Sequence, residues 1–93
     1  MKVAAIVVSH DGADDLRRSL PALAPQVDEL VVIANVPGSV PEGVEALHND
    51  RPAGYATNIN RGVARTSAEA VLAANPDAVP EPGAIAALRA FME

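Results

Sequence analysis

Cysteine and tryptophan are absent from the sequence, and the only phenylalanine or tyrosine side chains are Tyr55 and Phe91. Without cysteine the chain can form no disulfide framework, no zinc–thiolate site and no cysteine nucleophile, which suits a reducing, cytoplasmic location. With so few aromatic side chains, the core has to come from Val, Ile, Leu and Ala, which bury less apolar area per residue. At 93 residues the chain is expected to form one domain, residues 1–93, with a thin core.

Basic side chains are also few. The chain has 7 Lys and Arg residues against 12 Asp and Glu residues, so its net charge is −5, and the basic residues are scattered. Nucleic-acid binding depends on clustered Lys and Arg, so no nucleic-acid partner is expected. The first apolar run, residues 3–8, is far too short for a membrane span, and the chain is expected not to cross a membrane.

Apolar runs separated by turn signals predict the strands. Continuous runs over residues 3–8, 29–34 and 70–74 are typical of strands buried on both faces, as in a parallel sheet. Residues 44–48 form a weaker run and predict a short third strand. Pro and Gly are frequent between residues 37 and 43, which predicts a loop there.

Three helices are expected between and after these strands. The first carries Leu16, Leu20 and Leu23 on one face, with Asp11 as its cap. In the second, residues 55–65, the apolar face is marked by Ile59 and Val63, whereas Asn58, Arg61 and Arg65 lie outside it. The third follows Pro82, and its apolar face is formed by Ile85, Leu88 and Met92.

This alternation of strands and helices predicts an α/β fold. We expect a doubly wound parallel four-stranded sheet in the order 3-2-1-4, with helices on both faces. The carboxyl ends of all four strands then share one edge, and the chain direction reverses between the first and fourth strands. A ligand crevice is therefore expected between residues 9–12 and residues 75–77.

Polar residues gather at this predicted edge. They are Ser9, His10 and Asp11 after the first strand, Asn35 after the second, Asn49 and Asp50 after the third, and Asn75 and Asp77 after the fourth. Magnesium and manganese prefer oxygen ligands and take one or two carboxylates together with the oxygens of a substrate diphosphate. The crevice therefore suits a metal-bridged diphosphate, with Asp77 as the first candidate ligand.

Simpler interpretations of the same residues remain open. Asp11 serves equally well as a helix cap alone, and Asp77 as a turn residue in Asn75-Pro76-Asp77. His10 and His48 have no second histidine at ligand spacing. Adjacent residues such as Ser9, His10 and Asp11 rarely converge as a catalytic triad, and glycine-rich phosphate loops are absent.

Taken together, the motifs resemble those of the amino-terminal, nucleotide-binding half of family 2 glycosyltransferases, which are inverting enzymes of GT-A fold, and most closely their rhamnosyltransferase-like members. Four segments match in order, and the last two are the most specific. They are Val7-Val8-Ser9-His10-Asp11-Gly12, Val31-Val32-Ile33-Ala34-Asn35, the stretch from Asn49 through Gly54-Tyr55-Ala56 to Asn58, Asn60 and Gly62, and Asn75-Pro76-Asp77 with Glu81-Pro82-Gly83-Ala84.

The resemblance implies a site for a nucleotide-diphosphate sugar, linked to UDP or dTDP. It places Ser9, His10, Asp11, Asn35 and Asn58 around the nucleotide, and it places Asn75 and Asp77 in a DXD-like segment where Asp77 holds Mg²⁺ or Mn²⁺ against the diphosphate. Two positions depart from the family pattern: Ala34 stands where an aspartate is usual, and Asn75 replaces the first acid of the DXD motif.

The resemblance covers only half of the GT-A fold. In the family, the catalytic base that deprotonates the acceptor hydroxyl lies in the carboxyl-terminal half. These 93 residues are therefore expected to contain no catalytic residue and to transfer no sugar by themselves. The alternative function is a non-catalytic binding or assembly module that forms a homodimer through the bare edge of the fourth strand or through the last helix.

Overall fold

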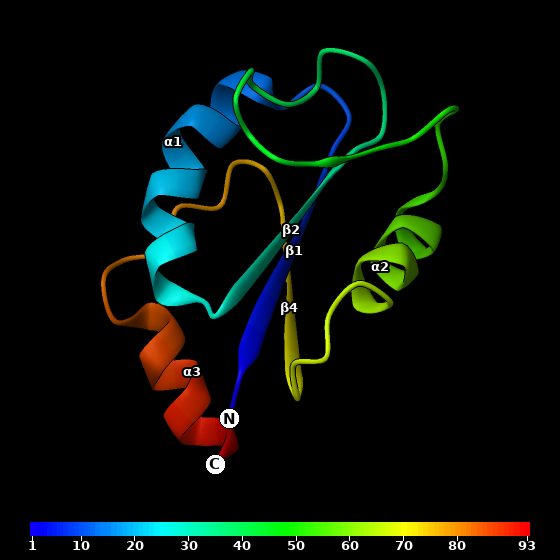
Figure 1. Cartoon of the computed structure of the whole chain (residues 1–93). Helices are drawn as coiled ribbons and strands as arrows, with labels where there is room; N and C mark the ends of the chain where they lie inside the picture. The colour runs from blue at the N-terminus through cyan, green and yellow to red at the C-terminus, as the bar shows by residue number, and fades with distance from the viewer.

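The structure, a computed structural model, describes residues 1–93 and contains one parallel four-stranded sheet with the order β3-β2-β1-β4 (Figure 1). Its strands are β1 (Val3–Ser9), β2 (Glu29–Ala34), β3 (Leu47–His48) and β4 (Ala70–Ala74). The predicted fold class and strand order are confirmed. The predicted third strand was too long, because only its last two residues pair with β2, at Ile33 and Ala34.

Strand β1 lies at the centre of the sheet and of the core. It pairs with β2 on one side and with β4 on the other, so that Ile6 lies between Val31 and Ala73. Residues 3–7 are at most 6% exposed, as expected for a continuous apolar run that is covered on both faces. Side chains of successive residues point to opposite faces, so β1 supplies apolar contacts to both layers of helices.

Helices α1 (Ala13–Leu23) and α3 (Ala84–Met92) cover one face of the sheet (Figure 1). A short 3₁₀ turn, η1 (Ala24–Gln26), links α1 to β2. The cluster on this face brings the helical side chains together with the odd-numbered side chains of β1; its members include Leu16, Leu20, Leu23, Ile85, Val3, Ala5 and Val7. The predicted apolar face of α1 is therefore confirmed. None of the three helices is long and apolar enough to cross a membrane.

The first helix is not capped by Asp11, contrary to the prediction. Its N-cap is Gly12, which makes no side-chain cap hydrogen bond. Instead the Gly12 N–H donates to Ser9 Oγ at 3.0 Å. A hydroxyl from the end of β1 thus satisfies this N–H. The Asp11 carboxylate makes no hydrogen bond within the chain.

Helix α2 (Tyr55–Val63) covers the other face, above β1 and β2 (Figure 1). The prediction that Ile59 and Val63 mark its inner face was wrong for Val63, which is exposed, while Ile59 is half-buried. The buried positions are Asn58 and Gly62, and Asn58 was expected to lie outside the inner face. The helix approaches the sheet so closely that a Cβ at position 62 would lie 2.6 Å from Cγ2 of Ile6.

Replacing Gly62 with alanine is expected to destabilise the protein. The new methyl group would collide with the side chain of Ile6, which is fully buried and has no free space to move into. Such overpacking costs about 1–3 kcal/mol, more than the 0.5–1 kcal/mol, roughly, that alanine gains over glycine in a helix. Urea unfolding measures the difference. Gly54→Ala is the control, because a Cβ there meets nothing within 4 Å; equal losses in both variants would contradict the close contact.

The start of β1 and helix α3 are joined by Asp28. Its Oδ2 accepts a hydrogen bond from the Val3 N–H at 2.8 Å and pairs with Arg89 Nη2 at 2.9 Å. The bond from Val3, with the charges of Arg89, Lys2 and the amino terminus, lowers the pKa of Asp28 against the opposing effect of burial. This carboxylate therefore holds α3 beside the edge strand β4.

Candidate functional site

The two loops predicted to face each other across a crevice do lie together. Residues 9–12 follow β1 and residues 75–77 follow the neighbouring strand β4, at the carboxyl ends of both strands. The loops touch where Gly12 meets Pro76, since a Cβ at Gly12 would lie 2.7 Å from the Pro76 Cβ. Only glycine leaves room for this contact, which holds the loop after β1 against the loop after β4.

Two exposed carboxylates flank this contact. Asp11 precedes Gly12 and Asp77 follows Pro76, and neither side chain makes a hydrogen bond or an ion pair within the chain. Asn75 is also exposed, and its carbonyl accepts a hydrogen bond from the Ala78 N–H at 3.0 Å, which closes the turn that presents Asp77. Asp77 is therefore both a residue of this turn and the candidate metal ligand.

Ser9 differs from its neighbours because it is fully buried. Its hydroxyl donates to the Ser39 carbonyl at 2.6 Å and accepts from the Gly12 N–H at 3.0 Å. The Ser9 hydroxyl therefore acts as both donor and acceptor to partners within the protein. Ser9 thus connects the loop after β2 to the start of α1.

Three asparagines from different elements form a cluster at the same edge, in which Asn35 and Asn58 are buried and Asn49 is half-buried. This asparagine cluster consists of Asn35 after β2, Asn49 after β3 and Asn58 in α2. Asn49 Nδ2 donates to Oδ1 of both Asn35 and Asn58 at 2.8 Å, and Asn58 Nδ2 donates to Asn35 Oδ1 at 3.1 Å. The cluster joins two strand ends to the helix on the far face of the sheet.

Asn35 is the centre of the asparagine cluster. Its Oδ1 also accepts the Ala53 N–H at 2.8 Å, and its Nδ2 donates to the Ala53 carbonyl at 3.1 Å. The remaining Nδ2 proton faces His10 Nδ1 at 3.2 Å. Asn35 and Asn58 therefore hold the loop of residues 49–54 in place, and their amides are occupied by protein partners.

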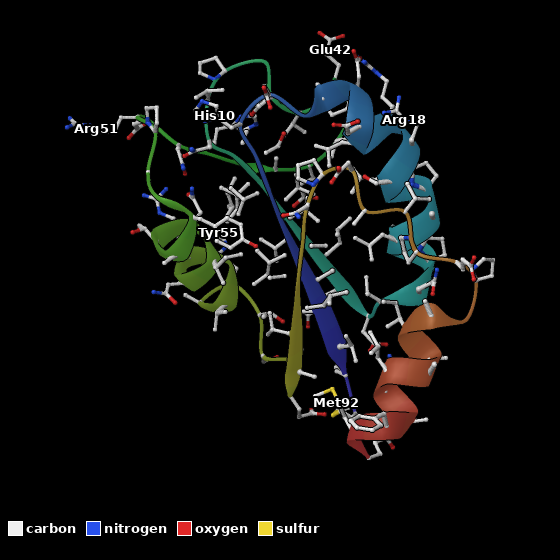
Figure 2. The ribbon with its side chains drawn as sticks, turned by 180° about the vertical axis from the view of Figure 1, so that it is seen from behind. His10, Arg18, Glu42, Arg51, Tyr55 and Met92 are labelled. Atoms are coloured by element: carbon white, nitrogen blue, oxygen red, sulfur yellow. The ribbon has the colours of Figure 1, made fainter.

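His10 and Arg61 lie at the two ends of this network. His10 is exposed at the carboxyl end of β1 (Figure 2), and Asn35 is its only hydrogen-bond partner. At the other end, Arg61 Nη1 donates to Asn49 Oδ1. The sequence does not assign a role to Arg61 and does not identify Asn49 as a binding residue. Asparagines recur at the ends of the second and third strands, but this pattern does not show which of their side chains form hydrogen bonds with each other.

The side chains at this edge suit a metal ion that is also bound by a diphosphate, rather than one held by protein ligands alone. No group of three or more His, Asp or Glu side chains lies together in a way that could hold a metal ion. Asp11 and Asp77 are unpaired carboxylates, and one or two carboxylates are the type of protein ligand that a diphosphate-bound Mg²⁺ or Mn²⁺ takes. The first turn of α1 adds backbone N–H groups without a side-chain cap, and such groups favour anions.

Apolar hollows border the opposite side of β4, where no strand pairs with it. One of about 330 Å³ extends from Leu23 and Leu72 to Pro80. Another of about 190 Å³ lies between β4 and α3 and includes Val71, Leu88 and Met92. The free edge of β4 is thus accompanied by apolar surface along its length.

Comparison with known proteins yields no family model and no curated protein that matches the chain.

Proposed function

We propose that this chain is the donor-binding unit of a glycosyltransferase and binds a nucleotide-diphosphate sugar at the edge between β1 and β4. The observation that carries the proposal is the contact of Gly12 with Pro76, which brings the unpaired carboxylates Asp11 and Asp77 to one switch point of a parallel sheet. The resemblance of the motifs to family 2 glycosyltransferases supports the same assignment.

In this proposal each residue has a distinct part. Asp77, presented by the Asn75 turn, is the carboxylate that holds Mg²⁺ or Mn²⁺ against the diphosphate, and Asp11, on the loop that contacts Pro76, is a second carboxylate at the same edge. The metal supplies charge neutralisation to the phosphate oxygens. Ser9 and the asparagine cluster keep the surrounding loops in position, while His10 lies toward β2, on the side where the nucleoside would extend.

The test is calorimetric titration of the 93-residue protein with UDP and with dTDP, each in the presence and absence of Mn²⁺. Binding that depends on the metal is expected for at least one of the two nucleotides. Sugar transfer is not expected from these residues, since the resemblance assigns the base to the other half of the enzyme. Failure of both nucleotides to bind with Mn²⁺ would overturn the proposal.

A second function, assembly into a homodimer, is favoured by the exposed apolar surface beside β4. Phe91 is 91% exposed, and Leu88 is exposed on the same helix. Met92, at the end of this helix, is also exposed (Figure 2). The Ala70 N–H donates to the Lys2 carbonyl, so the alternate residues Val71 and Ala73 turn their backbone groups outward, away from β1. An apolar edge strand without charge or proline is a template for strand pairing.

Homodimerisation predicts a concentration-dependent mass in analytical ultracentrifugation. Ala73→Pro removes an N–H that points away from β1, and it leaves the hydrogen bonds between β4 and β1 intact. Phe91→Ser removes the most exposed apolar side chain. Each variant is expected to shift the protein toward monomer. Val63→Ser is the control, since Val63 is exposed on α2, away from this surface. A wild-type protein that stays monomeric at millimolar concentration contradicts the prediction.

A further inference from the structure

The asparagine cluster has only one consistent set of amide orientations. Asn35 Oδ1 faces three N–H donors, from Asn49, Ala53 and Asn58, while its Nδ2 faces the Ala53 carbonyl at 3.1 Å. Rotating this amide by half a turn would put NH₂ against three donors and oxygen against a carbonyl. The orientation is therefore determined by the partners.

This orientation determines the state of His10. Because Asn35 Nδ2 can only donate, His10 Nδ1 at 3.2 Å has to accept, and the proton of the neutral ring lies on Nε2. His10 is exposed, and no other group of the chain bonds to its ring. His10 lies at the carboxyl end of β1 (Figure 2), so its Nε2–H is the ring donor without a partner at this edge.

Arg61 is the first donor in a series of hydrogen bonds that runs to His10. A guanidinium has donors only, so Arg61 donates to Asn49 Oδ1, which leaves Asn49 Nδ2 to donate to Asn35 Oδ1. Asn35 Nδ2 then donates to His10 Nδ1. Every hydrogen bond in this series points the same way, and hydrogen bonds aligned in series polarise one another.

We propose that the series Arg61, Asn49 and Asn35 is a positioning device that fixes His10 in its Nε2–H tautomer, so that His10 acts as a neutral hydrogen-bond donor to an oxygen of the bound nucleotide. Asn35 and Asn49 act through His10 and do not themselves touch the ligand. The role toward the ligand rests on the proposed function, whereas the tautomer rests on the hydrogen bonds alone.

Nitrogen-15 NMR of the imidazole rings, at a pH where they are neutral, tests the tautomer. The wild-type spectrum is expected to show His10 Nδ1 without a proton, Nε2 with one, and a correlation across the hydrogen bond from Asn35 Nδ2. His48, whose side chain makes no hydrogen bond, is the internal reference. A protonated Nδ1 on the neutral His10 ring overturns the proposal without any variant.

Asn35→Asp provides a change that a purely structural role would not produce. A carboxylate only accepts hydrogen bonds, so the proton of His10 is expected to move to Nδ1. Asn75→Asp is the matched control, since the Asn75 side chain is exposed and bonds to nothing in the chain. The same response of His10 to both variants would overturn the proposal, and the wild-type spectrum decides the matter if Asn35→Asp does not fold.

Calorimetry with UDP and Mn²⁺ tests the role toward the ligand. His10→Ala is expected to lower the affinity about tenfold, as for one lost hydrogen bond, and His10→Gln, which keeps an N–H donor, to recover most of it. The loss should be larger for UDP than for pyrophosphate. An unchanged affinity of His10→Ala overturns the ligand role alone. If the wild type binds neither UDP nor dTDP with Mn²⁺, the proposed function and this ligand role are both overturned, while the NMR result still decides the tautomer.

Discussion

Asp77→Ala is expected to abolish the metal-dependent part of nucleotide binding. Asp77 is the one carboxylate presented by the Asn75 turn, and it makes no hydrogen bond or ion pair that would give it another task. Changing groups that only support metal ligands costs about 10–100-fold in metal affinity, so loss of a ligand should cost at least about 100-fold. Titration of UDP with and without Mn²⁺ measures the change.

A control variant distinguishes the loss of a metal ligand from the general effect of removing one negative charge. Asp14→Ala removes the same charge from a side chain that is 87% exposed and paired only with Arg17. It is expected to bind UDP with Mn²⁺ as the wild type does, and both variants should keep the wild-type melting temperature. Equal losses for the two variants would show a general electrostatic effect, and an unchanged affinity of Asp77→Ala would exclude Asp77 as the metal ligand.

The strands could be predicted from the sequence because each is a continuous apolar run. Strands β2 and β4 begin and end at the predicted residues, and β1 is longer by Ser9 alone. A parallel sheet covered on both faces demands such runs, and few other structures produce them in alternation with amphipathic helices. The strand order 3-2-1-4 was the doubly wound arrangement expected for this alternation of strands and helices, and the structure confirms it.

The inner face of α2 could not be predicted in the same way. An amphipathic pattern assumes that apolar residues face the sheet, yet here the buried positions are Asn58 and Gly62. Asn58 is buried at little cost because amides from Asn35 and Asn49 satisfy it, and those partners are remote in sequence. The same limit applies to Asp11, because the helix begins one residue after this expected cap, with Gly12 as its N-cap and the Gly12 N–H bonded to Ser9 Oγ.

These observations give the candidate site two layers. The outer layer consists of exposed groups without partners, Asp11, Asp77 and the outer face of His10, which are free to meet a ligand. The inner layer consists of Ser9 and the asparagine cluster, whose side chains are hydrogen-bonded within the chain and, except for the half-buried Asn49, are buried. Positions in the outer layer should affect binding with little change in stability, and positions in the inner layer should affect stability first.

Asn35→Leu is therefore expected to cause the largest loss of stability. Leucine has a similar volume, so the change removes hydrogen bonds without leaving a large cavity. The Ala53 N–H, which donates to Asn35 Oδ1, loses its acceptor, and the amides of Asn49 and Asn58 each lose one bond. A buried unsatisfied donor costs about 1–3 kcal/mol and each lost hydrogen bond about 1 kcal/mol, so a total of about 3 kcal/mol is expected.

For a domain of this size, about 3 kcal/mol is a large share of a total stability of roughly 5–14 kcal/mol. The melting temperature should fall by at least about 10 °C in a thermal unfolding experiment followed by circular dichroism. Asn75→Leu is the matched control, because Asn75 is exposed at the same edge and its side chain bonds to nothing. If Asn35→Leu melts as late as that control, the asparagine cluster does not hold the loop of residues 49–54, because the loss of its central amide would then have no cost.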